Sequence, residues 1–177
     1  VDLFATPEDV AQAFKDFAAT INNDGFLTYC ADDEGARALA STVKTCTLIS
    51  YGIDESCDLR LDSIELEAMG SRARAIWRGK VVGFIELQVP GHHNLLNAAA
   101  VLATGLTLGF PAPELLTGLA VFRGTGRRFE LIGTVHGVRV IDDYGHHPTE
   151  IDVTLKAARR FAGDGRLIVI FQPHRYS

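Results

Sequence analysis

The sequence predicts an α/β protein, with a parallel α/β layer and an antiparallel meander followed by a second α/β unit. Strand-like and helix-like segments alternate over residues 6–51. Polar and apolar residues alternate with period two over residues 59–89, and a strand–helix–strand pattern covers residues 138–171. Alternating strands and helices favour parallel sheets, whereas period-two alternation is typical of antiparallel strands with one solvated face.

The first part of the chain predicts two strands, each preceded by a helix. Thr6 can cap a helix with Pro7 in its first turn, which is a typical helix start. The apolar side chains of this helix recur at helical spacing, at Val10, Phe14, Phe17 and Ile21. We expect a strand at residues 26–30, a second helix at 32–40 and a second strand at 46–51.

Residues 59–89 predict an antiparallel meander that packs on the α/β layer. The phase of the alternation slips once near Asp62 and Ser63, as a β-bulge would cause. Turns are expected at residues 69–71 and 79–80. No catalytic side chain stands out in this region.

Two helices and a joint follow the meander. The helix expected at residues 94–108 is apolar almost all round, which predicts deep burial, and another helix is expected at 113–120. Residues 123–129, RGTGRRF, form a Gly- and Arg-rich joint that could be a hinge, an anion site or both. We expect the domain boundary near residues 122–127.

The C-terminal stretch predicts a ligand site. We expect a strand at residues 138–142, a helix at 148–162 and a strand covered on both faces at 167–171. A crossover of this kind is almost always right-handed and joins parallel strands. The polar clusters at residues 142–146 and 172–175 would then meet at the carboxyl edge of one sheet, where open α/β sheets bind ligands.

Composition and charge narrow the possible functions. The 177 residues carry a net charge of −5, which gives no reason to expect nucleic acid or an anionic membrane as a partner. No apolar run reaches membrane-spanning length, and no segment has the pattern of a signal peptide. Cys30, Cys46 and Cys57 lack metal-ligand spacing and predict free thiols in a reducing compartment. The HH pairs are poor metal ligands because adjacent side chains point in different directions, so no metal site is expected.

Polar side chains near these helices and strands suggest nucleotide chemistry. Asn94 and Asn97 lie three residues apart on one helix face, and an amide offers the donor and acceptor that recognise a base edge such as adenine. Alternatively, Asn94 caps the helix and Asn97 satisfies backbone groups. Of the two acids at 142–143, one should point inward and could hold a ribose diol, and Arg127 or Arg128 could reach a phosphate.

Several strings resemble motifs of the Mur ligase family. The segment GHHNLLNA at residues 91–98 resembles the shared GxHNxxNA motif. RF at 128–129, DDYGHHPTEI at 142–151 and FQPHRYS at 171–177 follow in the family's order. The last two strings are long and specific, and they are most similar to the branch that adds L-alanine to UDP-N-acetylmuramate. Residues 1–89 match only in general pattern.

The resemblance implies two domains and an activity. Residues 1–122 would be the C-terminal part of a central ATPase domain, and residues 123–177 the start of a Rossmann-like C-terminal domain. The implied protein is a cytoplasmic enzyme of peptidoglycan synthesis that uses ATP and Mg²⁺. It would phosphorylate the lactoyl carboxylate of UDP-N-acetylmuramate, and the amine of L-alanine would attack the acyl phosphate to form an amide.

The resemblance also implies roles for individual residues. Asn94 and Asn97 would contact the adenine region, and Arg128 would reach the ribose–phosphate part of ATP. Asp143 would hold the ribose hydroxyls. Four further residues would line the place where alanine and the acyl phosphate meet: Tyr144, His146, His174 and Arg175. The motif places His93 at its histidine position without giving it a role.

One departure from the family concerns the phosphate loop. The sequence contains no GxxxxGK[ST], and phosphoryl transfer depends on such a loop and on a metal ion. We therefore expect the loop, the Mg²⁺ ligands and a UDP-binding domain upstream of Val1, and we expect the chain alone not to catalyse the ligation. One alternative is the related ligase that recycles murein tripeptide, against which Tyr144, Gly145 and the FQPHRYS string argue. Another is a stand-alone nucleotide-binding module without catalysis.

Overall fold

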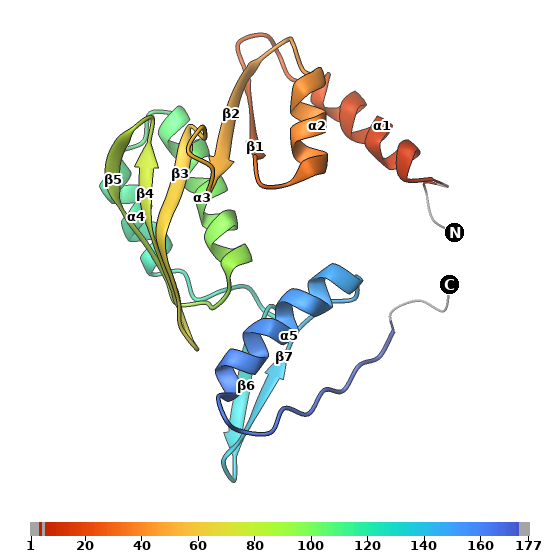
Figure 1. Ribbon diagram of the computed structural model, residues 1–177, viewed down its shortest axis with the longest axis vertical. Coiled ribbons are helices and arrows are strands. Elements are labelled where there is room, and N and C mark those ends of the chain that lie inside the picture. Colours follow the sequence, from red (N-terminus) through yellow and green to blue (C-terminus); the bar gives the residue numbers. More distant parts are fainter. Residues whose placement is uncertain (1–3, 5, 174–177) are drawn as a thin grey trace.

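The computed structural model describes Phe4 and residues 6–173 and confirms the predicted α/β class (Figure 1). The upper part in this view contains α1, α2, β1 and β2, the left part contains β3–β5 with α3 and α4, and the lower part contains β6, β7 and α5. The elements follow in the order α1 (Pro7–Ala18), β1 (Phe26–Cys30), α2 (Glu34–Thr42), β2 (Thr47–Gly52), β3 (Leu59–Leu66), β4 (Ser71–Trp77), β5 (Lys80–Leu87), α3 (His92–Thr107), α4 (Ala112–Ala120), β6 (Glu130–Val135), β7 (Val138–Asp142) and α5 (Pro148–Ala162).

The larger sheet is mixed, with the strand order β1-β2-β3-β4-β5. β1 and β2 are parallel, and β3, β4 and β5 form the antiparallel meander. The expectation that the meander packs on the α/β layer is wrong. The end of β2 pairs with the start of β3, at Tyr51↔Leu59 and Gly52↔Arg60, so both parts share one sheet. The predicted bulge is confirmed as a register shift between Asp62 and Glu65.

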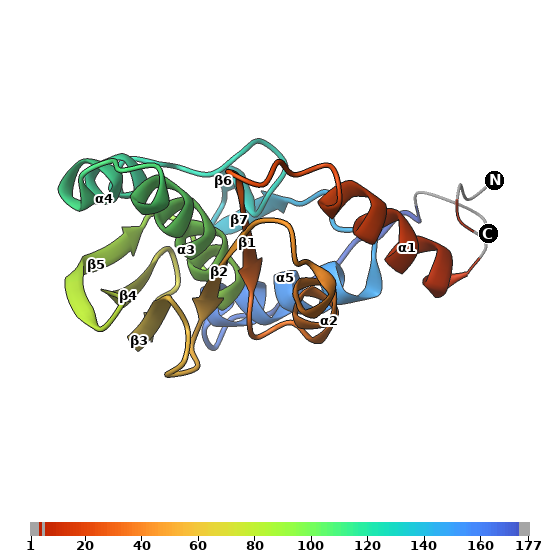
Figure 2. The same ribbon diagram turned by 90° about the horizontal axis from the view of Figure 1, so that it is seen from above.

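The core lies between one face of this sheet and α3, with α4 beside it (Figure 2). Ile49, Leu59 and Leu61 from the sheet meet Leu95 from α3, and all are 1% exposed or less. The prediction of deep burial all round α3 is only partly correct. Val101 on this helix is 54% exposed, because that side of α3 forms the wall of a pocket.

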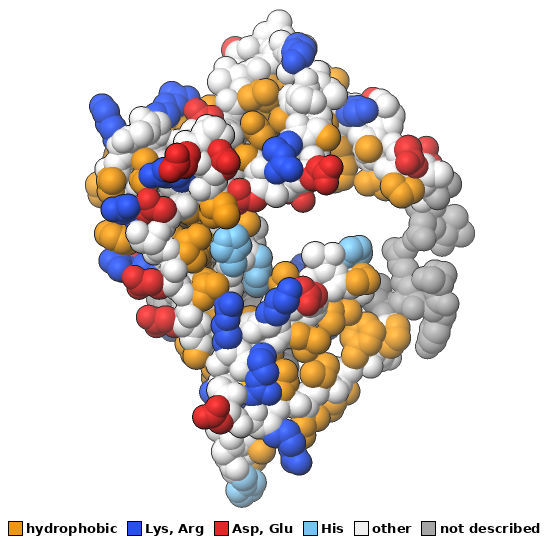
Figure 3. All heavy atoms as spheres, viewed as in Figure 1, with side chains coloured by type: hydrophobic (Ala, Val, Ile, Leu, Met, Phe, Trp, Pro, Cys, Tyr) orange, Lys and Arg blue, Asp and Glu red, His pale blue; other side chains and the backbone are white. Residues whose placement is uncertain are grey.

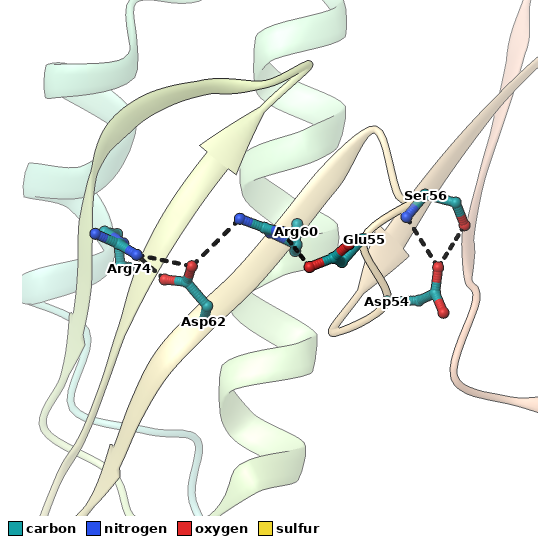
Figure 4. A network of polar contacts seen from close by, with 6 residues as sticks. All are labelled: Asp54, Glu55, Ser56, Arg60, Asp62 and Arg74. Carbon is teal, nitrogen blue, oxygen red and sulfur yellow. Dashed lines mark hydrogen bonds and ion pairs between the residues drawn. The ribbon is translucent and has the colours of Figure 1, made fainter.

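The opposite face of the meander carries polar side chains that pair across strands (Figure 4). Asp62 on β3 accepts hydrogen bonds of 2.7 and 2.9 Å from Arg74 on β4, and Arg60 lies 3.4 Å from the same carboxylate. Arg60 also lies 3.5 Å from Glu55. Arg74 binds Asp62 through two N–H groups in a part-buried contact, so this network links β3 to β4 on the outer face of the meander.

Both long amphipathic helices begin with a capping box. Thr6 accepts a hydrogen bond from the Asp9 backbone N–H, and the Asp9 carboxylate accepts one from the Thr6 N–H. His147 and Glu150 make the equivalent pair of contacts at the start of α5. Each box satisfies backbone N–H groups that the first helical turn leaves unpaired.

The C-terminal unit consists of the antiparallel β6–β7 hairpin with α5 packed on it. The Phe129 and Phe161 rings meet edge to face at 5.8 Å, and the Arg139 guanidinium lies 3.9 Å from the centre of the Phe161 ring. These contacts place α5 next to the hairpin and fix one wall of the pocket.

The predicted strand at residues 167–171 is wrong for the described structure. The segment is unpaired, and Ile168 and Ile170 are 68% and 94% exposed. A buried strand requires a neighbouring strand and a layer on each face, and no described element supplies these to the segment. The predicted parallel pairing with β7 is therefore absent from the described residues. His174 and Arg175 lie outside those residues. Among the helices of residues 6–173, none has the length and hydropathy of a membrane span.

Candidate functional site

A pocket of about 920 Å³ lies between α3, α4 and α5. Most of its polar side chains come from three segments: the start of α3, the joint after α4, and the region from the end of β7 to the first turn of α5; Glu114 on α4 and Thr154 on α5 complete the polar lining. Its apolar wall includes Val101, Leu115, Leu119, Phe122, Val153 and Ala157. A concave site with mainly apolar walls and a few converging polar groups is typical of small-molecule binding.

The start of α3 places two amides in this pocket. Gly91, the residue before the helix, has φ = +105°, and a Cβ there would lie 2.7 Å from the His93 ring, so the turn requires glycine. The Asn94 side-chain amide donates to the Pro90 carbonyl at 2.8 Å. Asn97 lines the pocket and makes no side-chain hydrogen bond to another described residue.

Two interpretations of the asparagines were open: recognition of a base edge, or helix capping by Asn94 with Asn97 bound to backbone groups. The observed contacts decide between them only in part. Asn94 does not act as the N-cap, because Gly91 holds that position and no side chain caps the helix there. Its N–H₂ group instead satisfies one backbone carbonyl, which leaves its oxygen without a partner among the described residues. Both side chains could therefore still offer hydrogen bonds to a ligand.

The two acids at the end of β7 point in different directions, as predicted. Asp143 lines the pocket and accepts hydrogen bonds from the backbone N–H groups of Phe129, at 2.9 Å, and Gly145, at 2.7 Å. Asp142 does not line the pocket and lies 3.4 Å from the Arg127 guanidinium. Asp143 is thus both a ligand candidate and the residue that ties the joint to β7.

Arg128 is the cation at the polar end of the pocket. The preceding residue, Arg127, has φ = +60°, and the following one, Phe129, has φ = +50°, so the joint bends sharply on both sides of Arg128. Arg128 Nη1 lies 3.5 Å from Glu150 Oε1 across the pocket mouth. A guanidinium has five N–H donors, so this ion pair leaves most of them available to an anion.

His93 also lines the pocket, on the side of α3. Burial lowers the pKa of His93, and the nearby Asp143 carboxylate opposes that shift. Figure 3 shows histidine, lysine and arginine side chains gathered where the upper and lower parts of the molecule meet, beside a wide opening.

Tyr144 and His146 lie next to the pocket but do not line it. Their rings meet edge to face at 5.3 Å, and the Arg127 guanidinium lies 4.9 Å from the centre of the Tyr144 ring. The structure therefore brings Asn94, Asn97, Arg128 and Asp143 together and sets Tyr144 and His146 beside them. His174 and Arg175 fall outside the described residues.

Sequence reasoning missed the part that Glu150 plays in the site. In the sequence, Glu150 stands in the first turn of the predicted helix at 148–162, where an acidic side chain is favourable in any helix. The structure places it in the pocket wall, in contact with Arg128. The spacing of His147 and Glu150, three residues apart before an apolar stripe, was the available signal for a capping box, but it gave no sign of the contact with the joint.

Comparisons with known proteins match most of the chain. Residues 1–105 match the Mur ligase middle domain, and residues 127–176 match the domain described as Mur ligase, glutamate ligase domain. The chain belongs to the Mur ligase family. This confirms the family resemblance found in the sequence motifs.

Two curated relatives with high identity carry the same name. The chain is 49% identical over 166 residues to the UDP-N-acetylmuramate–L-alanine ligase of Acidothermus cellulolyticus. The aligned region covers 93% of this chain and 35% of that relative. It is 45% identical over 180 residues to the same ligase of Paenarthrobacter aurescens, covering 100% of this chain and 38% of the relative. The chain thus spans little more than a third of the length of these relatives.

Solved Mur ligase structures share the fold. UDP-N-acetylmuramate–alanine ligase MurC from Thermotoga maritima aligns with a TM-score of 0.78 at 30% identity, over 97% of this chain and 38% of that one. MurF from Acinetobacter baumannii aligns with a TM-score of 0.80 at 23% identity, over 89% of this chain and 34% of the MurF chain. A murein peptide ligase from Psychrobacter arcticus aligns with a TM-score of 0.68 at 24% identity, over 88% of this chain and 32% of the ligase chain.

Proposed function

We propose that this Mur ligase chain forms one part of an ATP-dependent ligase that joins L-alanine to UDP-N-acetylmuramate in peptidoglycan synthesis. The observation that carries the proposal is the pocket that Asn94 and Asn97 on α3 line together with Arg128, in the joint, and Asp143, beyond it. The names of the relatives at 49% and 45% identity support the choice of substrates. We propose residues 1–122 as the end of the central domain and residues 123–177 as the start of the C-terminal domain.

The pocket has the size and chemistry to hold an adenine nucleotide. Its apolar wall suits a flat base, and the amides of Asn94 and Asn97 suit the base edge. The Asp143 carboxylate accepts two backbone N–H groups and keeps acceptor capacity for a ribose hydroxyl. The Arg128 guanidinium is placed to pair with a phosphate.

The residues of the chain would bind and orient the reactants. Bound ATP would supply the phosphoryl group that activates the substrate carboxylate as an acyl phosphate. Tyr144 and His146 lie within three residues after Asp143, so they would stand next to the nucleotide, where alanine and the acyl phosphate meet. His174 and Arg175 are proposed for the same place, and the arginine fork matches the carboxylate of alanine.

Mg²⁺ is not assigned to any residue of the chain. Residues 6–173 contain no group of three or more His, Cys, Asp or Glu side chains arranged to hold a metal ion. Mg²⁺ is nevertheless part of the proposal, since the ligase would use it together with ATP. The proposed substrates also imply a cytoplasmic protein.

Two alternatives make different predictions. A ligase that recycles murein tripeptide would accept the peptide instead of L-alanine. A stand-alone nucleotide-binding module would bind ADP without turnover. The likeness to the murein peptide ligase structure, at 24% identity, concerns the fold alone.

The test uses the full-length product of the gene that encodes this chain. With ATP, Mg²⁺ and UDP-N-acetylmuramate, we expect ADP release that depends on L-alanine and is lost by more than about tenfold in Arg128→Ala. ADP release that requires the tripeptide would favour the recycling ligase. ADP binding without turnover by either acceptor would favour the stand-alone module. The 177-residue chain alone should not turn over ATP.

A further inference from the structure

The Glu150 carboxylate contacts both the loop before α5 and the joint that carries Arg128. Its Oε2 lies 3.2 Å from the backbone N–H groups of both His146 and His147, and it accepts a hydrogen bond from each. Its Oε1 lies 3.5 Å from Nη1 of Arg128, which belongs to the joint. Hydrogen bonding from the His146 N–H, followed by that from His147, lowers the pKa of Glu150, so the side chain is ionised at neutral pH.

The other capping box of the chain shows which of these contacts is unusual. In α1, the Asp9 carboxylate accepts a hydrogen bond from the Thr6 N–H and forms none of the ion pairs found among residues 6–173. Helix capping therefore explains the contacts of Oε2 but not the contact of Oε1. At Glu150 the second oxygen faces a cation from another segment, inside a pocket wall.

We propose that Glu150 is a positioning residue, which orients the Arg128 guanidinium toward the phosphates of the bound nucleotide. This inference rests on the proposed nucleotide site and deepens it. The Arg128 and Glu150 side chains are 52% and 36% exposed, so their ion pair is solvent-screened and adds little stability. Its effect is on direction: Nη1 contacts the carboxylate, and the other N–H donors of this pocket-lining guanidinium are left for an anion.

The same carboxylate sets the loop that carries the proposed acceptor residues. The two N–H groups that it accepts belong to His146 and His147, and the His146 Nδ1 lies 3.7 Å from Oε2. Glu150 thus holds the phosphate-binding cation and the loop after Asp143 in one fixed arrangement. A nucleoside such as adenosine has no phosphates, so its binding would not depend on the orientation of Arg128.

The test is ADP and adenosine binding to the full-length gene product, measured by titration calorimetry. Glu150→Gln keeps an oxygen that can cap α5 but removes the charge that holds Arg128. We expect it to weaken ADP binding about fivefold and to change adenosine binding less than about twofold. The matched control is Asp152→Asn on the same helix, which breaks an exposed ion pair of 2.6 Å with Lys156 away from the pocket and should change neither affinity.

A double variant separates positioning from a general structural role. In an Arg128→Ala background, Glu150→Gln should have little further effect on ADP binding, because its target is gone. Equal losses for ADP and adenosine, or an undiminished effect in the Arg128→Ala background, would overturn the inference while leaving the nucleotide site in place. If the unmodified protein binds no ADP, the proposed function fails and the inference fails with it.

Discussion

Asp143 Oδ2 accepts a hydrogen bond from the Phe129 backbone N–H at 2.9 Å. Phe129 has φ = +50°, a conformation that a bulky residue rarely adopts, so the carboxylate holds the joint in a bend that would otherwise be unfavourable. The bend sets the direction of the neighbouring Arg128. The Asp143 carboxylate therefore helps to shape the pocket in the absence of a ligand.

Asp143→Ala should destabilise the chain by about 1 to 3 kcal/mol, because it leaves two part-buried N–H groups without their charged acceptor. The adjacent Asp142→Ala is the matched control. It removes only an exposed pair with Arg127 and should cost less than about 1 kcal/mol. Urea unfolding of the three proteins gives the comparison, and equal losses would contradict the structural part assigned to Asp143.

The two asparagines of α3 should differ in their effect on stability. Asn94→Ala removes the hydrogen bond to the Pro90 carbonyl and should cost about 1 kcal/mol. Asn97→Ala removes an exposed side chain and should change stability by less than about 0.5 kcal/mol. If both contact the base, each should still weaken ADP binding by the full-length gene product about tenfold. Unchanged ADP affinity in Asn97→Ala would remove that residue from the site.

Substitution by alanine should have opposite effects on stability at two helical glycines, Gly105 and Gly118. A Cβ at Gly105 on α3 would lie 2.6 Å from Leu115 Cδ2 on α4, so Gly105→Ala should overpack the contact and destabilise the fold by about 1 to 2 kcal/mol. A Cβ at Gly118 on α4 meets no atom within 4 Å. Gly118→Ala should therefore stabilise the helix by about 0.5 to 1 kcal/mol. Thermal unfolding would decide, and a rise in Tm for Gly105→Ala would contradict the close packing of α3 and α4.

Stability should fall at alkaline pH because of two groups near the end of β2. Burial raises the pKa of Cys57 from 9.0 to about 11 and that of Tyr51 from 10.0 to about 12. In the unfolded chain both groups lose their protons at lower pH, so their contribution is complete below pH 9 and declines as the pH rises toward 12. Unfolding measured from pH 8 to 11 should show a shallower decline in Cys57→Ala. Identical slopes in the two proteins would argue against a raised thiol pKa.

The sequence predicted the elements whose signals are local. The Thr6 cap, the bulge near Asp62 and the start of α5 at Pro148 depend on residues a few positions apart, and all three are confirmed. The strand at residues 167–171 failed because a strand exists only with a partner, and its apolar composition does not reveal whether one is present. The single sheet that joins β2 to β3 was missed for the same reason.

The sequence singled out some of the polar residues that line the pocket, but not the contacts between them. Asn94, Asn97, Arg128 and Asp143 stood out because their chemistry is unusual for their positions, and one pocket contains all four. The ion pair of Arg128 with Glu150 depends on left-handed backbone at Arg127 and Phe129. Arginine and phenylalanine rarely adopt this conformation, so the sequence does not predict it. The nucleotide and acceptor roles of these residues stay predictions.

The joint between α4 and β6 has a consequence for affinity as well as for shape. The described chain crosses once from the wall of α3 and α4 to the wall of Arg128, Asp143 and α5, through a few residues after Phe122. A ligand that touches both walls is therefore bivalent: once the first wall holds it, the second is presented as a tethered partner at an effective concentration in roughly the millimolar range. Tether length is then a determinant of affinity in its own right for any ligand that touches both walls.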